Sequence, residues 1–299
     1  MPALPTTQHP DRQEAVETPF TTFDGRTLAV FDWPLPDNQP VRGVVLMVHG
    51  LGEHAWRYNT LATELVQAGF VVRAYDQRGH GDSWGHRGCL PHADTLLRDL
   101  TELLEDTQTT LCERLRSPLV LLGHSMGALV AALWVARNQT SGPLPALGVD
   151  ALVLSSPALS VPLTPWQNLL LGVLPSWLPR FTVHNGIDPA LLSHDPDATE
   201  AYLNDPRIHH RVSPRLARFI VQAGPEVLRQ VPHWRVPTLL LYAGLDALVD
   251  PAGSRFMARR APPGIVTAQC FEGFLHDVLH EQERHLAVDA LLNWLWRRF

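Results

Sequence analysis

The chain has 299 residues, which is long enough for one large hydrophobic core with an inserted subdomain. Its hydrophobic content of 45% and charged content of 18% are those of a globular protein, and a net charge of −6 without a basic stripe argues against nucleic acid as a partner. The three cysteines are scattered and odd in number, which argues against a disulfide framework and favours a reducing compartment.

Residues 1–17 are expected to form a mobile leader. They lack the early positive charge and the apolar core of a signal peptide. No stretch of the chain approaches the ~20 consecutive apolar residues that a transmembrane helix needs. We therefore expect a cytoplasmic protein.

Short apolar runs alternate with helix-forming segments through the first half of the chain. Residues 21–31 predict a β-hairpin around an Asp-Gly turn. Further strands are predicted at 41–48, 70–75, 118–123 and 151–155, and helices at 58–68, 94–115 and 126–136. This alternation, with strands that are apolar throughout, is typical of a mostly parallel sheet covered by helices on both faces.

The most informative stretch is Gly123-His124-Ser125-Met126-Gly127, which lies between an apolar strand and a helix-forming segment. A serine at a sharp strand-to-helix turn takes a strained backbone geometry, and glycines two residues away on either side allow close backbone approach. The hydroxyl is then exposed beside the first N–H groups of the helix. The pattern predicts Ser125 as a catalytic nucleophile; the alternative is an ordinary strand-to-helix turn.

An acid and a histidine should follow such a serine in that order along the chain. Asp246 follows the apolar run at 236–244, at the strand end where α/β sheets place their active residues. His276 follows a further predicted strand at 264–271. A buried carboxylate would orient the imidazole, which would remove the serine proton.

Both assignments have a rival four residues further on. Asp250 precedes Pro251, and this pair is typical of a helix start, with the aspartate as N-cap. His280 lies one helical turn beyond His276 and is interpreted as a surface or packing residue. Their positions at the strand ends favour Asp246 and His276 as the catalytic acid and base.

A glycine-rich segment, His-Gly-Leu-Gly at residues 49–52, directly follows the strand that ends at Val48. Glycines after a strand allow a tight turn, so that a backbone N–H can face the nucleophile. An oxyanion hole in this architecture takes one N–H from this loop and one from the residue after the serine. This predicts the N–H groups of Leu51 and Met126 as the oxyanion donors.

Four passages together resemble the monoacylglycerol lipase and lysophospholipase branch of the α/β-hydrolases. They are His-Gly-Leu-Gly-Glu-His-Ala-Trp-Arg-Tyr at 49–58, Asp-Gln-Arg-Gly-His-Gly-Asp-Ser at 76–83, Gly-His-Ser-Met-Gly at 123–127 and His-Asp-Val-Leu-His-Glu at 276–281. The first two are specific to this branch. The resemblance covers residues 18–298 and is weakest between 160 and 232. Ala128 departs from it, because the family usually has a second glycine there.

The resemblance implies an α/β-hydrolase fold with a mostly parallel central sheet, helices on both faces and an inserted helical cap. It also implies a serine hydrolase that cleaves a monoacylglycerol or another single-chain lipid ester, with no metal or organic cofactor. A lysophospholipase, a general carboxylesterase or a thioesterase would use the same three residues, and a peptidase is a further alternative. From another class, a non-catalytic binding protein on this fold would be free to lose the triad that this chain keeps.

The alternation of strands and helices breaks over residues 157–235, a proline-rich segment that we interpret as the inserted cap. It would divide the hydrolase core into residues 18–156 and 236–299. Apolar residues recur at helical intervals from Leu169 to Trp177. This pattern predicts either a face that packs on the core or a lid that lines an acyl channel or touches a lipid surface.

Other polar residues leave alternatives open. Arg78 and His80 either touch substrate or belong to a structural turn in which Arg78 pairs with Asp82. Glu53 and Arg57 either lie near a glycerol or head group or form an ion pair that stiffens the oxyanion loop. The pair at residues 209–210, His-His, has no further ligand nearby and is interpreted as a surface pair rather than a metal site.

Overall fold

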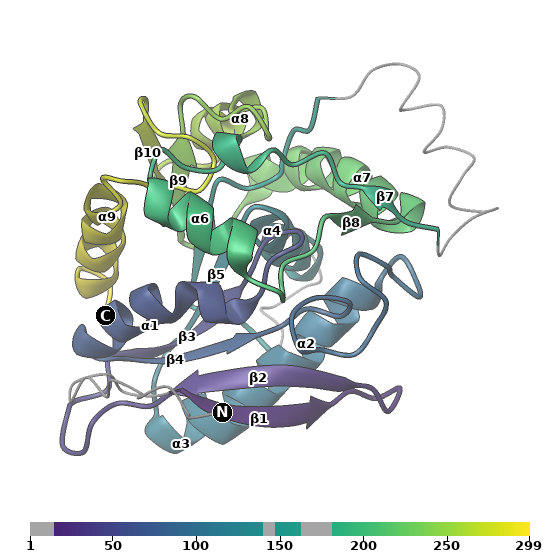
Figure 1. Ribbon diagram of the computed structural model, residues 1–299. Coiled ribbons are helices and arrows are strands. Elements are labelled where there is room, and N and C mark those ends of the chain that lie inside the picture. The colour runs from purple at the N-terminus through teal and green to yellow at the C-terminus, as the bar shows by residue number, and fades with distance from the viewer. Residues whose placement is uncertain (1–14, 140–146, 163–180) are drawn as a thin grey trace.

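The computed structural model describes residues 15–139, 147–162 and 181–299. Two N-terminal strands, β1 (Val16–Thr21) and β2 (Thr27–Trp33), form the predicted hairpin. Six further strands run parallel to one another: β3 (Gly43–Val48), β4 (Phe70–Tyr75), β5 (Leu119–His124), β6 (Ala151–Ser155), β9 (Thr238–Ala243) and β10 (Val266–Phe271). The eight strands form one sheet in the order β1-β2-β4-β3-β5-β6-β9-β10, in which β2 pairs antiparallel with β4 (Figure 1).

The central strands β3, β4, β5, β6 and β9 are buried throughout, whereas the edge strand β10 is mostly exposed. Because alternate residues of a strand point to opposite sides, both faces of the central sheet are covered. Along β3, Val44 and Leu46 pack into one hydrophobic core, whereas Val45 and Met47 pack into the other. The first core is covered by α2 (Thr95–Thr107), α4 (Met126–Asn138), α7 (Pro214–Gln230) and α8 (Ala252–Arg260). The second is covered by α1 (Asn59–Gln67) and α9 (His285–Trp296). The predicted fold class, a mostly parallel sheet between two helical layers, is confirmed.

The helix predicted over 94–115 is continuous but not uniform. It begins as α2, passes through a π-helical turn at Gln108–Cys112 and ends in α3 (Glu113–Leu115). Arg116 then takes a positive φ of 50° and closes it. Neither of these local changes leaves a signal in the hydrophobic pattern, because the apolar face of the helix continues through them.

The described part of the segment between β6 and β9 folds over the carboxyl ends of the strands (Figure 1). It contains η3 (Pro189–Leu191), α6 (Pro196–Asn204), α7, and the antiparallel pair β7 (Val183–His184) and β8 (Arg211–Val212). Helix α7 rests on the loop after β6, since a Cβ on Gly224 would lie 2.2 Å from the Leu159 carbonyl oxygen. The cap boundaries at 157 and 235 stay a prediction. The apolar pattern from Leu169 to Trp177 and residues 1–14 of the expected leader lie outside the described residues.

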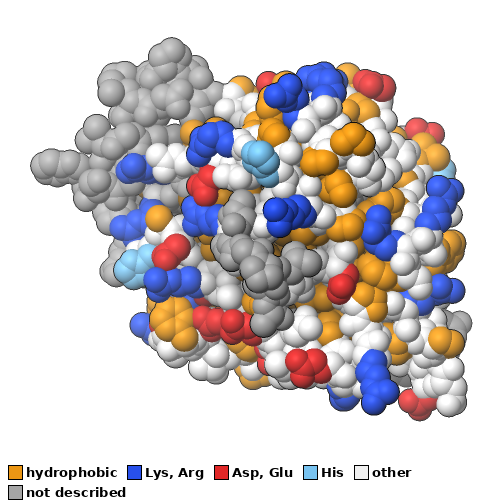
Figure 2. Space-filling model, turned by 180° about the vertical axis from the view of Figure 1, so that it is seen from behind, with side chains coloured by type: hydrophobic (Ala, Val, Ile, Leu, Met, Phe, Trp, Pro, Cys, Tyr) orange, Lys and Arg blue, Asp and Glu red, His pale blue; other side chains and the backbone are white. Residues whose placement is uncertain are grey.

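Within the described ranges, no helix is long and apolar enough to cross a bilayer. The cytoplasmic location stays a prediction. On the face turned away in Figure 1, basic, acidic and apolar side chains are interspersed (Figure 2).

Arg78 is a buried anchor, and its predicted pairing with Asp82 is wrong. Its guanidinium donates two hydrogen bonds to Asp99 of α2, at 2.9 and 2.6 Å. It also binds Asp24 in the β1–β2 turn, at 2.7 and 3.1 Å. The reason is burial: a guanidinium enclosed by protein needs carboxylates in bidentate geometry, which α2 and the hairpin supply. Asp82 instead donates its backbone N–H to Asp76.

Removing the Asp99 carboxylate tests this anchor. Both side chains of the Arg78–Asp99 pair are 1% exposed, so Asp99→Ala leaves a buried charge only partly compensated by Asp24. We expect a loss of about 3 kcal/mol in the free energy of unfolding, measured by urea denaturation. The matched control is Asp94→Ala at the N-cap of the same helix, whose pair with Arg98 is about half exposed. It should cost less than about 1 kcal/mol. Equal losses in the two variants would contradict the assignment.

Candidate active site

Ser125 lies in a strained turn between β5 and α4. Its φ is +52° and its ψ is −116°, a conformation that side-chain-bearing residues rarely adopt. The two flanking glycines are required by packing: a Cβ on Gly123 would lie 2.6 Å from the Ala128 Cα, and one on Gly127 would lie 2.1 Å from the Val48 carbonyl oxygen. This is the geometry expected of a nucleophile elbow.

The structure brings Ser125, His276 and Asp246 into one hydrogen-bonded chain. The Ser125 Oγ lies 2.8 Å from His276 Nε2, and His276 Nδ1 lies 2.7 Å from Asp246 Oδ2. Because a carboxylate only accepts, Nδ1 carries the imidazole proton and Nε2 is free to accept the serine proton. The second carboxylate oxygen of Asp246 accepts from the N–H groups of Leu248 and Val249, at 3.0 and 2.9 Å, which fixes its orientation.

The two rival residues have other partners. Asp250 accepts from the Ala252 N–H at 2.8 Å and so lies at the start of α8, although the N-cap is Pro251 rather than Asp250 as predicted. His280 is bound through Nδ1 to Asp277 and through Nε2 to the Arg57 carbonyl oxygen, both at 2.9 Å. It is therefore a packing residue.

The predicted oxyanion donors line the same cavity as Ser125 and His276. Met126 is the first residue of α4, where backbone N–H groups have no intrahelical acceptor. The N–H of Leu51 belongs to the peptide whose carbonyl is that of Gly50, and this oxygen lies 2.7 Å from His49 Nδ1. His49 Nε2 accepts from the Gln77 N–H at 2.9 Å, which leaves the proton on Nδ1. Since the peptide is planar and trans, this hydrogen bond also fixes the direction of the Leu51 N–H.

Glu53 and Arg57 form the internal ion pair that the sequence left as one of two alternatives. The buried Glu53 carboxylate also accepts from the Gly50 N–H and from the Tyr58 hydroxyl. Burial is the largest effect and would raise the pKa of Glu53, but Arg57 and the other neighbouring groups together outweigh it and lower the pKa to about 2. Arg57 reaches on to Asp277 at 3.2 Å. The Glu53 carboxylate thus stiffens the loop at residues 49–54, which carries the candidate oxyanion donor Leu51 and is called the oxyanion loop.

Asp277 and His124 also lie in the candidate site, although neither was predicted from the sequence. Both are buried, and Asp277 binds Arg57 and His280 while His124 Nδ1 bonds the Ser155 hydroxyl at 3.0 Å. The signal that could have found them is their position, because each directly precedes or follows a predicted triad residue within a quoted motif.

His209 is 7% exposed, so its interpretation as a surface residue is wrong. The segment before β8 folds back against the oxyanion loop, and the His209 N–H donates to the Gly52 carbonyl oxygen at 2.8 Å. The ring of His210 turns the other way and packs 5.5 Å from that of His184. In residues 15–139, 147–162 and 181–299, no group of three or more His, Cys, Asp or Glu side chains has the arrangement of a metal site.

A nucleophile elbow at the carboxyl end of a central strand, on a mostly parallel sheet between helical layers, defines an α/β-hydrolase. The chain belongs to the serine aminopeptidase family, S33, which matches residues 39–283, and it is a hydrolase.

Comparison with known proteins shows which branch of the α/β-hydrolases this chain resembles. The monoacylglycerol lipase of Mycolicibacterium smegmatis is 33% identical over 278 residues, which are 91% of this chain and 94% of that protein. An uncharacterized abhydrolase domain-containing protein of Dictyostelium discoideum is 30% identical over 93% of this chain, which spans only 28% of that protein's length. The crystal structure of Paleococcus ferrophilus monoacylglycerol lipase superposes with a TM-score of 0.77 at 30% identity, covering 96% of this chain and 100% of that one. The resemblance to the monoacylglycerol lipase branch is confirmed.

The pH dependence of the reaction tests the His276–Asp246 pair. Burial alone would lower the pKa of His276, but the hydrogen bond and charge of Asp246 outweigh it and raise the pKa above its usual value. A base must be neutral, so kcat/KM should fall as the pH drops through this raised pKa. Asp246→Asn should move that limb to lower pH and reduce kcat by about 10⁴, because the imidazole loses its orienting acceptor.

The measurement is kcat/KM against pH for a soluble ester. Asp250→Asn is the matched control and should leave the limb unchanged, because that carboxylate bonds the Ala252 N–H at the start of α8 rather than His276. An acid limb that stays in place in Asp246→Asn would contradict the role of the pair.

Proposed function

We propose that this hydrolase cleaves carboxylic esters of single-chain lipids, with a monoacylglycerol as the preferred substrate. The observation that carries the proposal is the hydrogen-bonded chain from Asp246 through His276 to Ser125, which ends at an apolar cavity. The similarity to named monoacylglycerol lipases over almost the whole chain supports this choice of substrate.

In the proposed reaction, Ser125 Oγ attacks the acyl carbonyl carbon while His276 Nε2 takes the hydroxyl proton. Asp246 stabilises the imidazolium, and the N–H groups of Leu51 and Met126 bind the oxyanion. The tetrahedral intermediate collapses, and the alcohol leaves with the proton from His276. Water then attacks the acyl-enzyme, gives a proton to the imidazole and releases the acid, after which the serine regains its proton.

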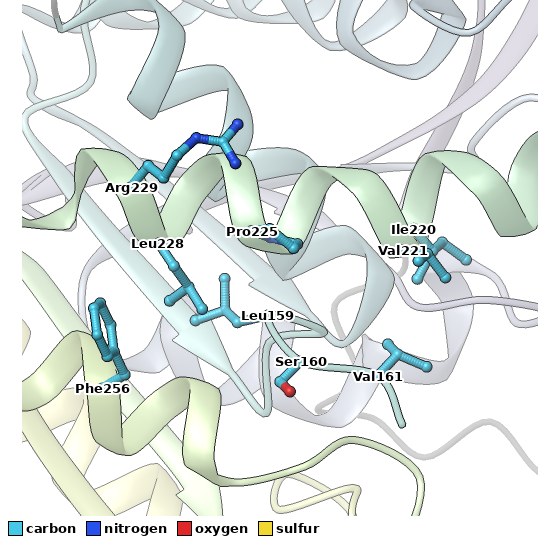
Figure 3. Close-up of a pocket in the computed structure, with 9 residues that line it drawn as sticks. All are labelled: Leu159, Ser160, Val161, Ile220, Val221, Pro225, Leu228, Arg229 and Phe256. Carbon is cyan, nitrogen blue, oxygen red and sulfur yellow. The ribbon is translucent and has the colours of Figure 1, made fainter. Parts of the chain in front are cut away.

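Two adjoining hollows offer space for an acyl chain. The cavity at Ser125 has a volume of about 330 Å³. A groove of about 560 Å³ shares Val161, Ile220 and Val221 with it and continues between α7 and α8 (Figure 3). Leu159, Leu228 and Phe256 line the further part of this groove. We propose that a long acyl chain passes from the cavity over the shared residues into the groove.

The alternatives differ in what the cavity must hold. A lysophospholipase, a general carboxylesterase or a thioesterase would use the same chemistry with another leaving group. A peptidase that recognises a free amino terminus needs a carboxylate near its ammonium group, and among the described residues that line the cavity there is none. Exposed apolar side chains between β6 and β9, Phe181, Val183 and Leu203, support a transient contact with a lipid surface.

Substrate panels test the proposed activity. Wild type should hydrolyse a monoacylglycerol faster than a diacylglycerol, a triacylglycerol, a lysophospholipid or an acyl thioester, measured as initial rates of acid release. Ser125→Ala should lose at least about 10³ of the rate, because the nucleophile is gone. If short-chain p-nitrophenyl esters were the only substrates, still through Ser125, the mechanism would stand and the lipid substrate would be wrong.

Filling the groove tests the path of the acyl chain. Leu228→Trp should lower kcat/KM for long-chain p-nitrophenyl esters by roughly tenfold or more, because each lost methylene contact costs about 1 kcal/mol. Esters short enough to stay in the Ser125 cavity should be hydrolysed as by wild type. Gln222→Trp adds the same bulk to α7 outside the groove and serves as the control. An equal effect on all chain lengths would show that the chain takes another path.

A further inference from the structure

Three buried imidazoles from three separate segments, one of them the oxyanion loop itself, lie in a row. His49 follows β3, His80 lies in the turn after β4, and His209 precedes β8. The ring centroids of His49 and His80 are 5.3 Å apart, and those of His80 and His209 are 4.6 Å apart. None of the three takes part in the reaction proposed above.

Backbone hydrogen bonds fix one proton on each ring. His49 carries it on Nδ1, as the bonds to Gly50 and Gln77 require. His80 Nδ1 lies 3.2 Å from the Arg78 carbonyl oxygen and must donate to it. His209 Nδ1 accepts from the Arg211 N–H at 3.2 Å, so its proton is on Nε2. Because a ring nitrogen that accepts a hydrogen bond carries no proton, these bonds hold His49 and His209 in the neutral form.

Burial agrees with this charge state. It is the main cause that lowers the pKa of His49 and of His209 to about 4. For His80, burial and the neighbouring imidazoles together lower the pKa well below the usual value. Arg87 adds to the effect on His209. The row is thus uncharged at neutral pH and packs as a set of flat, partly apolar rings.

The segment that carries His209 also holds the oxyanion loop through its backbone. Besides donating to the Gly52 carbonyl oxygen, His209 places its own carbonyl oxygen only 2.5 Å from where a Cβ on Gly52 would be. Two residues further along the loop, His54 Nε2 lies 2.9 Å from Asp205 Oδ2. The loop is therefore held after Leu51 by the hydrogen bond from His209 to Gly52. Before Leu51 it is held by the hydrogen bond from the His49 ring to Gly50.

We propose that His209 is a positioning residue for the oxyanion hole: its ring supports His80 and through it His49, whose hydrogen bond to the Gly50 carbonyl directs the Leu51 N–H at the oxyanion. This inference rests on the proposed function, because it gives His209 a role in the same reaction. Losing the ring leaves a space beside His80, and the His49 ring and the Gly50–Leu51 peptide can then tilt. A misplaced donor weakens the transition state far more than the bound substrate.

The experiment compares His209→Ala, His209→Phe and His210→Ala in the full chain. Each is measured for kcat and KM on a medium-chain ester and for the Ki of an alkyl trifluoromethyl ketone, which adds the serine hydroxyl to its carbonyl and presents an oxyanion. We expect His209→Ala to lower kcat by about tenfold to a hundredfold with little change in KM, and to weaken the ketone by a similar factor. His209→Phe should recover most of both losses, because a flat ring again fills the space.

His210→Ala is the matched control, because its ring packs on His184 and Tyr202 rather than on His80, and it should behave as wild type. Thermal unfolding of each variant separates misfolding of the chain from misplacement of the Leu51 N–H. If His209→Ala is unstable, a folded His209→Phe variant with restored kcat still tests the role of the ring. The inference is overturned if His209→Ala keeps wild-type kcat and Ki, or if kcat falls while the ketone binds as before. Wild type that hydrolyses no ester and binds no ketone would instead overturn the proposed function itself.

Discussion

The close contact between the start of α4 and the end of β3 is the constraint on which the candidate site depends. Gly127 presses against the Val48 carbonyl oxygen, at a place where any side chain would push the two elements apart. This contact puts Ser125 at a positive φ and places the loop after β3 directly beside it. Ser125, the candidate nucleophile, and the loop that carries the candidate oxyanion donor Leu51 are therefore positioned by one backbone contact, in which no side chain takes part.

A group of buried charged side chains holds the loops of the candidate site in place without taking part in the proposed reaction. Glu53, Arg57 and Asp277 are enclosed together, and each of them bonds to a loop of the site. Removing one member of such a group leaves a buried charge without its partner and lowers the free energy of unfolding by about 3–5 kcal/mol. We therefore expect the loops to rearrange when any one member is lost. Backbone irregularity at the strand ends is thus stabilised by charge, while the strands themselves are stabilised by apolar burial.

The sequence was sufficient wherever a residue's role depends on its neighbours along the chain. Apolar runs located the parallel strands, and their ends located Ser125, Asp246 and His276, which the structure brings together. It failed for Arg78 and His209, because their partners come from α2 and from the turn after β4, far away in sequence. The sequence gives the type of each charged or imidazole side chain. Whether that side chain is buried depends on its tertiary contacts, which the sequence pattern does not reveal.

The segment between β6 and β9 also holds two loops of the candidate site in place. Besides lining the cavity, it bonds the loop of the candidate base: the Asp277 N–H donates to the Leu192 carbonyl oxygen at 2.8 Å, and the Ser193 hydroxyl donates to that of His280 at 2.8 Å. On the other side, the backbone of His209 bonds the oxyanion loop. One segment therefore shapes the cavity and braces both loops of the proposed chemistry. Changes made there to alter substrate preference would also alter the placement of the candidate base and the candidate oxyanion donor, so we expect substrate preference and rate to change together.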